Sequence, residues 1–190
     1  MNPLMNRRYA FLMIVAAMVG AVSSASGRAE QVDNPQYASW AKHKPGTSVT
    51  MHHETTAMGM AMIQQTVQTL ADVTPDKVTI ELTVTMEMAG QKHNMKQKRD
   101  IPAKVEKGQE YLPPGYKGTV KELPSESVEI AGKGYDCKVF EFSGESDKGK
   151  ASGKVWRSTD IPGDTAKMDM TVQGQQQATI KMTVTAIEIK

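Results

Sequence analysis

The chain has a single cysteine, Cys137, among 190 residues. One cysteine excludes an intramolecular disulfide and any metal centre built from several thiolates. The surrounding run, GYDCKVFEF, alternates like a strand, which is typical of a buried thiol that packs as a small apolar side chain. Stability must therefore come from ordinary packing and hydrogen bonding.

The sequence also lacks the short motifs of common enzymes. It has no G-x-S-x-G elbow, no H-E-x-x-H zinc motif, no P-loop and no C-x-x-C pair. Glu81 and Glu87 share one predicted strand but stand about 20 Å apart, too far to act as a carboxylate pair. We therefore expect a protein that is not an enzyme and uses no cofactor.

Neither sign of charge dominates the chain. Of its 23 basic residues, three fall within residues 1–29, which hold no acidic residue. The remainder has 20 basic residues against 21 acidic ones, with Lys and Glu interleaved. Such a near-neutral chain argues against a nucleic-acid partner.

Only one long apolar run occurs. The 14 residues Tyr9–Val22 follow Arg7 and Arg8 and precede small residues, with cleavage positions after Ala25 or Ala29. This order is that of a secretory signal peptide, and the run is short for a membrane span. We expect residues 1–29 to be removed and residues 30–190 to form one domain, periplasmic or secreted, with no membrane span.

The rest of the chain alternates between apolar and polar residues. KVTIELTVTMEM, residues 77–88, alternates without a break, and two later segments repeat the pattern. Period-two alternation predicts strands with one buried face. A β-bulge near Ala186 is expected because the apolar parity slips there. The predicted strands span about 47–56, 61–73, 77–89, 92–99, 118–130, 135–143, 150–157, 165–173 and 177–189.

These strands are long, consecutive and joined by short turns, which favours an antiparallel meander. One short helix is predicted ahead of them, with Asn34 as N-cap, Pro35 at its first position and Pro45-Gly46 beyond its end. A single helix cannot cover so much apolar sheet. The expected fold is mainly β: a barrel or half-barrel with the helix at its mouth. A two-sheet sandwich is the alternative.

The inward face of this sheet is predicted to be rich in methionine. A curved face of this kind suits a lipid or another apolar small molecule, because flexible thioethers adapt to irregular guests. A filled core serving a structural or interaction domain is the alternative. The predicted lining residues are Val78, Ile80, Leu82, Val84, Met86, Met88, Met168, Met170, Met182 and Val184.

A third hypothesis comes from the stretch MHHETTAMGMAM, residues 51–62. Thioethers and imidazoles are the ligands of copper sites, and the candidate set is Met51, His53, Met60 and Met62. Alternation places at most one of two adjacent histidines on the methionine face. The hairpin supplies too few ligands that converge on one point, so we expect Cu(I) binding no tighter than micromolar.

One segment carries a resemblance to a known family. KVWRSTDIPGDTAKMDMTV, residues 154–172, followed by one more hairpin, resembles hairpins of the outer-membrane lipoprotein carrier superfamily. It also looks like a group of secreted bacterial proteins with G-x-x-Y-x-C before W-x-S-x-x-x-P-G. The matching residues are Gly132, Tyr135, Cys137, Trp156, Ser158, Pro162 and Gly163.

The resemblance covers about sixty residues. Lipoprotein carriers are half-barrels whose concave face holds acyl chains, so the resemblance implies that architecture and an apolar ligand. This chain has one helix candidate where carriers cover the cavity with several. No catalytic or ligand residue is carried across.

Overall fold

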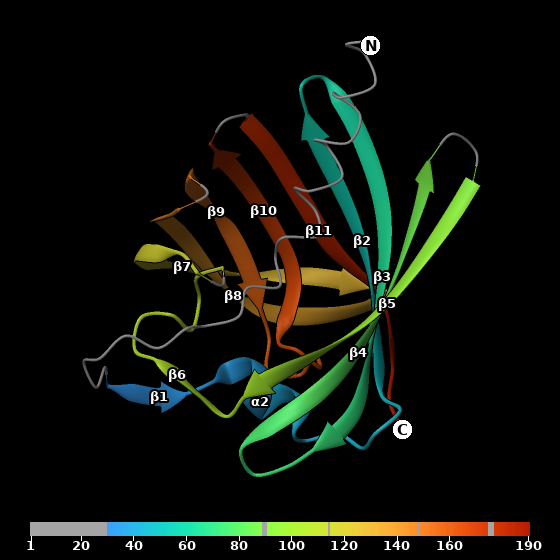
Figure 1. The fold of residues 1–190 in the computed structure, drawn as a ribbon. Helices are drawn as coiled ribbons and strands as arrows, with labels where there is room; N and C mark the ends of the chain where they lie inside the picture. The colour runs from blue at the N-terminus through green and yellow to red at the C-terminus, as the bar shows by residue number, and fades with distance from the viewer. Residues whose placement is uncertain (1–29, 89–90, 114, 148, 175–176) are drawn as a thin grey trace.

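A computed structural model of the chain describes residues 30–88, 91–113, 115–147, 149–174 and 177–190 (Figure 1). The predicted signal peptide, residues 1–29, lies outside the described residues. Among the described residues no helix is long and apolar enough to cross a membrane.

A nine-stranded antiparallel sheet dominates the molecule, with the strand order β5-β4-β3-β2-β11-β10-β9-β8-β7. The sheet curls without closing, so β5 and β7 are its edges (Figure 1). The prediction of a mainly β barrel or half-barrel is confirmed, and the open edges make it a half-barrel. Its strands are β2 (Ser48–Ala57), β3 (Met60–Val73), β4 (Lys77–Met88), β5 (Gln91–Pro102), β7 (Lys117–Ile130), β8 (Lys133–Ser146), β9 (Gly149–Arg157), β10 (Thr165–Gln173) and β11 (Gln177–Glu188).

The register agrees with the parity read from the sequence. The even-numbered residues of β4 from Val78 to Met86 are buried, while Glu81 is exposed. In β11 the register shifts between Val184 and Ala186, the predicted bulge position. The shift returns Ile187 to the inward face, opposite Val49.

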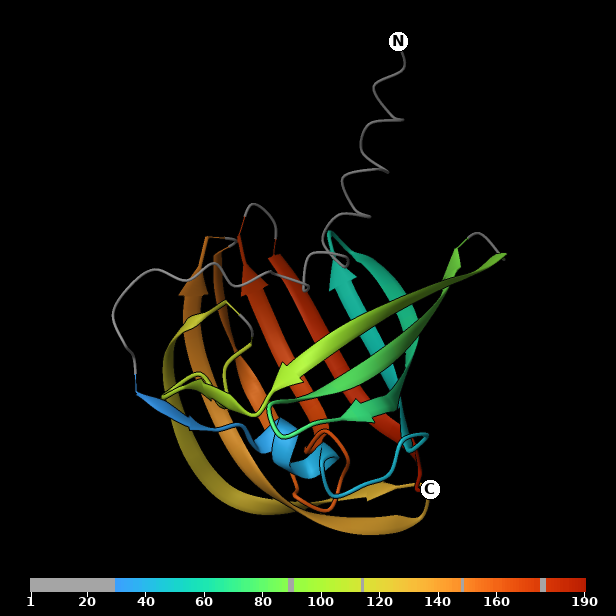
Figure 2. The same cartoon turned by 60° about the horizontal axis from the view of Figure 1, so that its bottom comes forward.

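A short helix and a small sheet sit in the hollow of the large one (Figure 2). Helix α2 (Pro35–Trp40) is capped by the Asn34 side chain, which accepts a hydrogen bond from the Gln36 amide at 3.0 Å. The helix ends at Trp40, well before the predicted stop at Pro45-Gly46. Strands β1 (Gln31–Asp33) and β6 (Lys104–Glu106) pair beside it. Three residues are too few to show alternation, so the sequence did not predict these strands.

Trp40 joins the helix to the concave face of the sheet. Its side chain is 0% exposed and belongs to the main core cluster. The other fully enclosed members come from several strands and from the turn after β9, and include Val49, Leu70, Val78, Ile80, Val139, Ile161, Ala166 and Val184. The lower half of the concave face, taken as the end that carries α2, is therefore filled.

A second cluster covers the concave face of β8–β10. The segment between β6 and β7 lays Leu112 there, and Tyr111 stacks on Phe140 with ring centroids 4.1 Å apart. Phe142 and Met170 are buried in the same cluster. Among the described residues, neither cluster covers the upper end of the concave face on β2–β5.

The hairpin of β7 and β8 bends beneath the sheet (Figure 2). Its register shifts between Leu123 and Glu126, where Pro124 interrupts the ladder of this edge strand. Beyond the bend, β7 contacts β10 and β11. The indole nitrogen of Trp156 donates a 2.7 Å hydrogen bond to Glu126 Oε2, which ties the bent hairpin to β9.

The register makes a direct stability prediction at two neighbouring positions. Leu82 is buried in the core, whereas Thr83 points to the outward face. Leu82→Ala is expected to lower the free energy of unfolding by about 2–5 kcal/mol, since it leaves a cavity. Thr83→Ala is expected to cost about 0.5–1 kcal/mol. Urea unfolding of both variants tests this, and equal small losses would show that the strand register is wrong.

Candidate functional site

The concave face is ordered in rows that run across the strands. One row, called here the central row, crosses six strands because each residue stands directly opposite the next in the antiparallel ladders. It comprises Met168, Met182, His53, Gln64, Met86 and His93. Side chains opposite one another on the same face have Cβ atoms about 4.5–5.5 Å apart, so the row is a continuous strip of contacts.

The predicted lining residues share this face. Nine of the ten, all but Met88, have described side chains, and their register puts each on the concave side. Met168 is partly exposed and the other eight are buried. These side chains therefore pack in the core as well as forming the floor of the face. Their contact with a ligand stays a prediction.

The two adjacent histidines separate as alternation requires. His53 faces the concave side, and His52 faces outward, with its Nε2 3.4 Å from Glu54 Oε1. Met58 has a φ of 52° beside Gly59 at the tip of the β2–β3 hairpin. Met58 thus lies outside both faces.

The four candidate copper ligands lie on one face but do not all meet. Met51 and His53 are neighbours along β2, and Met60 and Met62 lie across from its upper half. The Met51 sulfur accepts a hydrogen bond from Gln68 Nε2 at 3.4 Å, on the side away from His53. Met60 is 52% exposed near the hairpin turn. Only Met62 remains close to His53 from the opposite strand.

Sequence reasoning did not bring Met182 to His53. The two stand directly opposite one another because β11, the last strand, pairs with β2. Alternation gives the parity of each residue within its strand, but it does not say that the first and last long strands are neighbours. Met95, 46% exposed on the same face through its pairing with Val84, was also missed as a lining residue.

His53 has an unusual environment for a histidine. Its ring is mostly buried, and its Nε2 is fully buried without a hydrogen-bond partner among the described residues. Burial, helped by the adjacent His52, lowers the pKa of His53 to about 4. Met182 and Gln64 stand directly opposite His53 on the adjacent strands, and Met51 and Thr55 are its neighbours two positions away on β2. None of these four residues carries a charge.

This environment makes stability depend on pH. The pKa of His53 is lower in the folded chain, about 4, than its ordinary 6.5, so the folded state favours the neutral ring. The folded state therefore has its full free energy of unfolding, as far as His53 is concerned, above about pH 6.5. As the pH falls toward 4, protonation of His53 in the unfolded chain lowers this free energy by on the order of 3 kcal/mol. Urea unfolding at about pH 7.5 and pH 4.5 should show a larger loss for the native chain than for His53→Leu. Equal losses would contradict a buried neutral imidazole.

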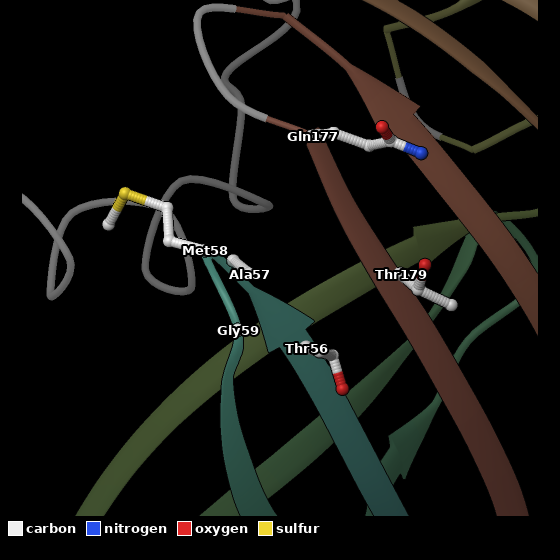
Figure 3. A pocket seen from close by; sticks show the side chains of 6 residues that line it. All are labelled: Thr56, Ala57, Met58, Gly59, Gln177 and Thr179. Carbon is white, nitrogen blue, oxygen red and sulfur yellow. The ribbon is translucent and has the colours of Figure 1, made fainter.

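Two open hollows are lined by described residues, and neither resembles an active site. The hollow of about 420 Å³ in Figure 3 lies beside the β2–β3 turn and is lined by Thr56, Ala57, Met58, Gly59, Gln177 and Thr179. The other, about 580 Å³, lies over β7–β11 among outward side chains such as Lys121, Glu141 and Lys154. Among the described residues, no three His, Cys, Asp or Glu side chains gather as a metal site.

Cys137 lies on β8 within the bent hairpin, and its side chain is buried in the main core cluster. Burial, together with nearby Asp136, raises the pKa of its thiol to about 11. Its Sγ lies 3.5 Å from the Tyr135 carbonyl oxygen. The group is therefore a protonated packing residue at neutral pH, and it is poorly suited to act as a nucleophile.

The segment that resembles the lipoprotein carriers forms a buried polar clamp. Arg157 donates from Nε and Nη2 to Asp164 Oδ1 at 3.1 and 2.9 Å, and from Nη1 to the Glu110 carbonyl at 2.5 Å. Both side chains of the pair are nearly enclosed, at 8% and 4% exposure. Asp164 has a φ of 57°. The motif thus fixes the turn after β9 to the segment before β7, which is a structural role.

Comparison with known proteins adds little to this geometry. No family model matches the sequence, and no curated protein matches it significantly. Among solved structures, the fold is similar to one from Bacteroides fragilis that bears the name of an exported protein with a YmcC-like fold. The match covers 77% of this chain and 97% of the other, at 9% identity and a TM-score of 0.42. Similarity at that level carries no argument about function.

Proposed function

We propose that the chain is an exported, non-enzymatic binding module that holds an apolar ligand on the upper concave face. The observation that carries the proposal is the exposure of methionines there. Met60 and Met95 are 52% and 46% exposed on the inward side of β3 and β5, the side whose lower half forms the core. Apolar side chains exposed on an otherwise core-forming face mark a surface that a partner or ligand covers.

The surroundings of these methionines favour an apolar guest. Half-buried Met62 and Ile180 continue the surface across β3 and β11, and buried Met86 forms its floor. Thioether side chains are flexible and polarisable, so they adapt to chains of varied shape. Lysine and glutamate project instead from the outward face of β4 and β5, as in the Lys98–Glu81 ion pair at 3.0 Å. This arrangement supports a lipid or similar small molecule.

The non-enzymatic part of the proposal rests on the side chains that are present. The side chains of the buried Arg157–Asp164 pair are engaged with one another and with the Glu110 carbonyl, and Cys137 is held as a thiol. The export part rests on the basic, apolar and small-residue order of residues 1–29.

Binding can be tested with the fluorescent apolar probe N-phenyl-1-naphthylamine and its displacement by a fatty acid. The double variant Met60→Glu/Met95→Glu introduces charge on the concave face at positions that are already half exposed. We expect the affinity for the probe to fall by about tenfold or more, which corresponds to losing the burial of part of one apolar side chain.

Ile63→Glu is the matched control. Ile63 is 59% exposed on β3, but its register opposite Glu54 places it on the outward face. Its substitution is expected to change probe affinity by no more than about twofold. No saturable probe binding by the native chain, or equal losses in both variants, would favour the alternative of a structural or interaction domain with a filled core.

Export is tested separately by intact mass of the protein recovered outside the inner membrane. We expect a chain that begins after Ala25 or Ala29, because small residues precede both positions. Recovery of exported chain that still carries residues 1–24 would contradict signal cleavage at these positions.

A further inference from the structure

Among the described residues, the Nε2 of His53 is the one fully buried side-chain polar atom of the central row that has no hydrogen-bond partner. A buried nitrogen left without a partner costs about 1–3 kcal/mol. Gln64, the neighbour on β3, does not relieve it, because its side-chain amide donates to Thr66 Oγ1 at 3.1 Å. A ligand at this nitrogen would recover the cost.

Two methionines neighbour His53 on the concave face, one from each adjacent strand. Met182 on β11 stands directly opposite His53, within about 4.5–5.5 Å between Cβ atoms. Met62 on β3 stands opposite Thr55, which makes it the diagonal neighbour of His53 at about 7–8 Å. Both side chains are long and flexible enough to bring a sulfur to a common point with the imidazole.

We propose that His53 Nε2 and the sulfurs of Met182 and Met62 form a site for a soft monovalent cation, Cu(I). Thioethers select Cu(I), and imidazole is a good ligand for copper. The site holds neutral ligands only, and the residues paired with or next to His53 on this face are uncharged. A doubly charged ion such as Zn(II) or Cu(II) would pay a larger desolvation cost there than Cu(I).

The neighbours of the ring support this assignment. The residues directly opposite His53 and those two positions away on β2 are Met182, Gln64, Met51 and Thr55, and none of them carries a charge. The ligand set differs from the hairpin set of the sequence analysis, and it predicts tighter Cu(I) binding than the micromolar limit expected there. Met182 joins it through the β2–β11 pairing, Met51 is engaged by Gln68, and Met60 lies toward the turn. The inference is independent of the apolar-ligand proposal.

The test is an anaerobic competition titration of the mature chain with Cu(I) bound to bicinchoninate. The native chain is expected to withdraw one Cu(I) from the chelator. His53→Leu, Met182→Leu and Met62→Leu are each expected to weaken binding by at least about tenfold. The Met→Leu changes nearly conserve volume, so the fold should persist, and circular dichroism confirms it for each variant.

Met60→Leu and Met95→Leu are the matched controls, since both methionines are on the same face but outside the proposed set. They are expected to change Cu(I) affinity by no more than about twofold. No withdrawal of Cu(I) by the native chain overturns the proposal. Equal losses in the controls also overturn it, because they would show nonspecific binding by exposed methionines. Probe binding is measured without copper, so failure here leaves the apolar-ligand proposal to its own test.

Discussion

Arg157→Met is expected to destabilise the folded chain by about 3–5 kcal/mol, because it leaves the buried Asp164 carboxyl without its partner. Arg157 donates to both Asp164 and the Glu110 carbonyl, so the change also frees the segment before β7. That segment carries Tyr111, over whose ring the Arg157 guanidinium lies at 5.0 Å. Urea unfolding gives the free energy, and limited proteolysis should report earlier cleavage within residues 107–116.

The matched variant is Asp164→Asn, alone and combined with Arg157→Met. Asn tolerates the positive φ of position 164, so backbone strain is not added. If the two side chains act as a pair, the double variant should lose less than the sum of the single losses, by about 0.5–3 kcal/mol. Strict additivity would contradict the pair as the element that fixes this turn.

Trp40→Ala is expected to lower the free energy of unfolding by about 3–5 kcal/mol, because the indole fills the concave face beneath α2. Its Nε1 is buried without a partner among the described residues, so the indole contributes mainly packing. Trp40→Phe should therefore cost clearly less than Trp40→Ala. The difference between the two midpoints of urea unfolding measures the packing, and equal losses would contradict this role.

Gly163 shows how closely the turn approaches this indole. Its φ is 82°, and a Cβ added there would lie 2.9 Å from Trp40 Nε1. The Pro-Gly step after Trp156 in the sequence is thus explained by local backbone geometry and by contact with the helix. This contact spans more than a hundred residues of sequence, which is why the motif alone did not reveal it.

Local patterns in the sequence were sufficient to predict the long strands and the β-bulge in β11. Alternation fixed which side of β4 is buried, and the parity slip in β11 located the bulge before Ala186. Turn residues such as Pro75 separated the strands correctly. These features depend on residues close together in the chain, so a sequence read without homologues can predict them.

Features that depend on distant pairing were not predictable. The β2–β11 ladder places Met182 beside His53, and β6 meets β1 through segments too short to show a pattern. The bend of the β7–β8 hairpin and the Arg157–Asp164 clamp likewise follow from tertiary packing. For the proposed copper site, the sequence therefore identified the concave face and His53. It did not reveal that Met182 on β11 is the partner of His53.

Native mass spectrometry of the mature chain after incubation with a fatty acid or a phospholipid shows whether the protein holds an apolar molecule. The native chain and Ile63→Glu should each gain the mass of one apolar molecule, and Met60→Glu/Met95→Glu should remain at its own mass. This result would place the ligand on the upper concave face. A native chain that stays bare at every ligand concentration, or uptake that is the same in all three proteins, would contradict binding on the upper concave face.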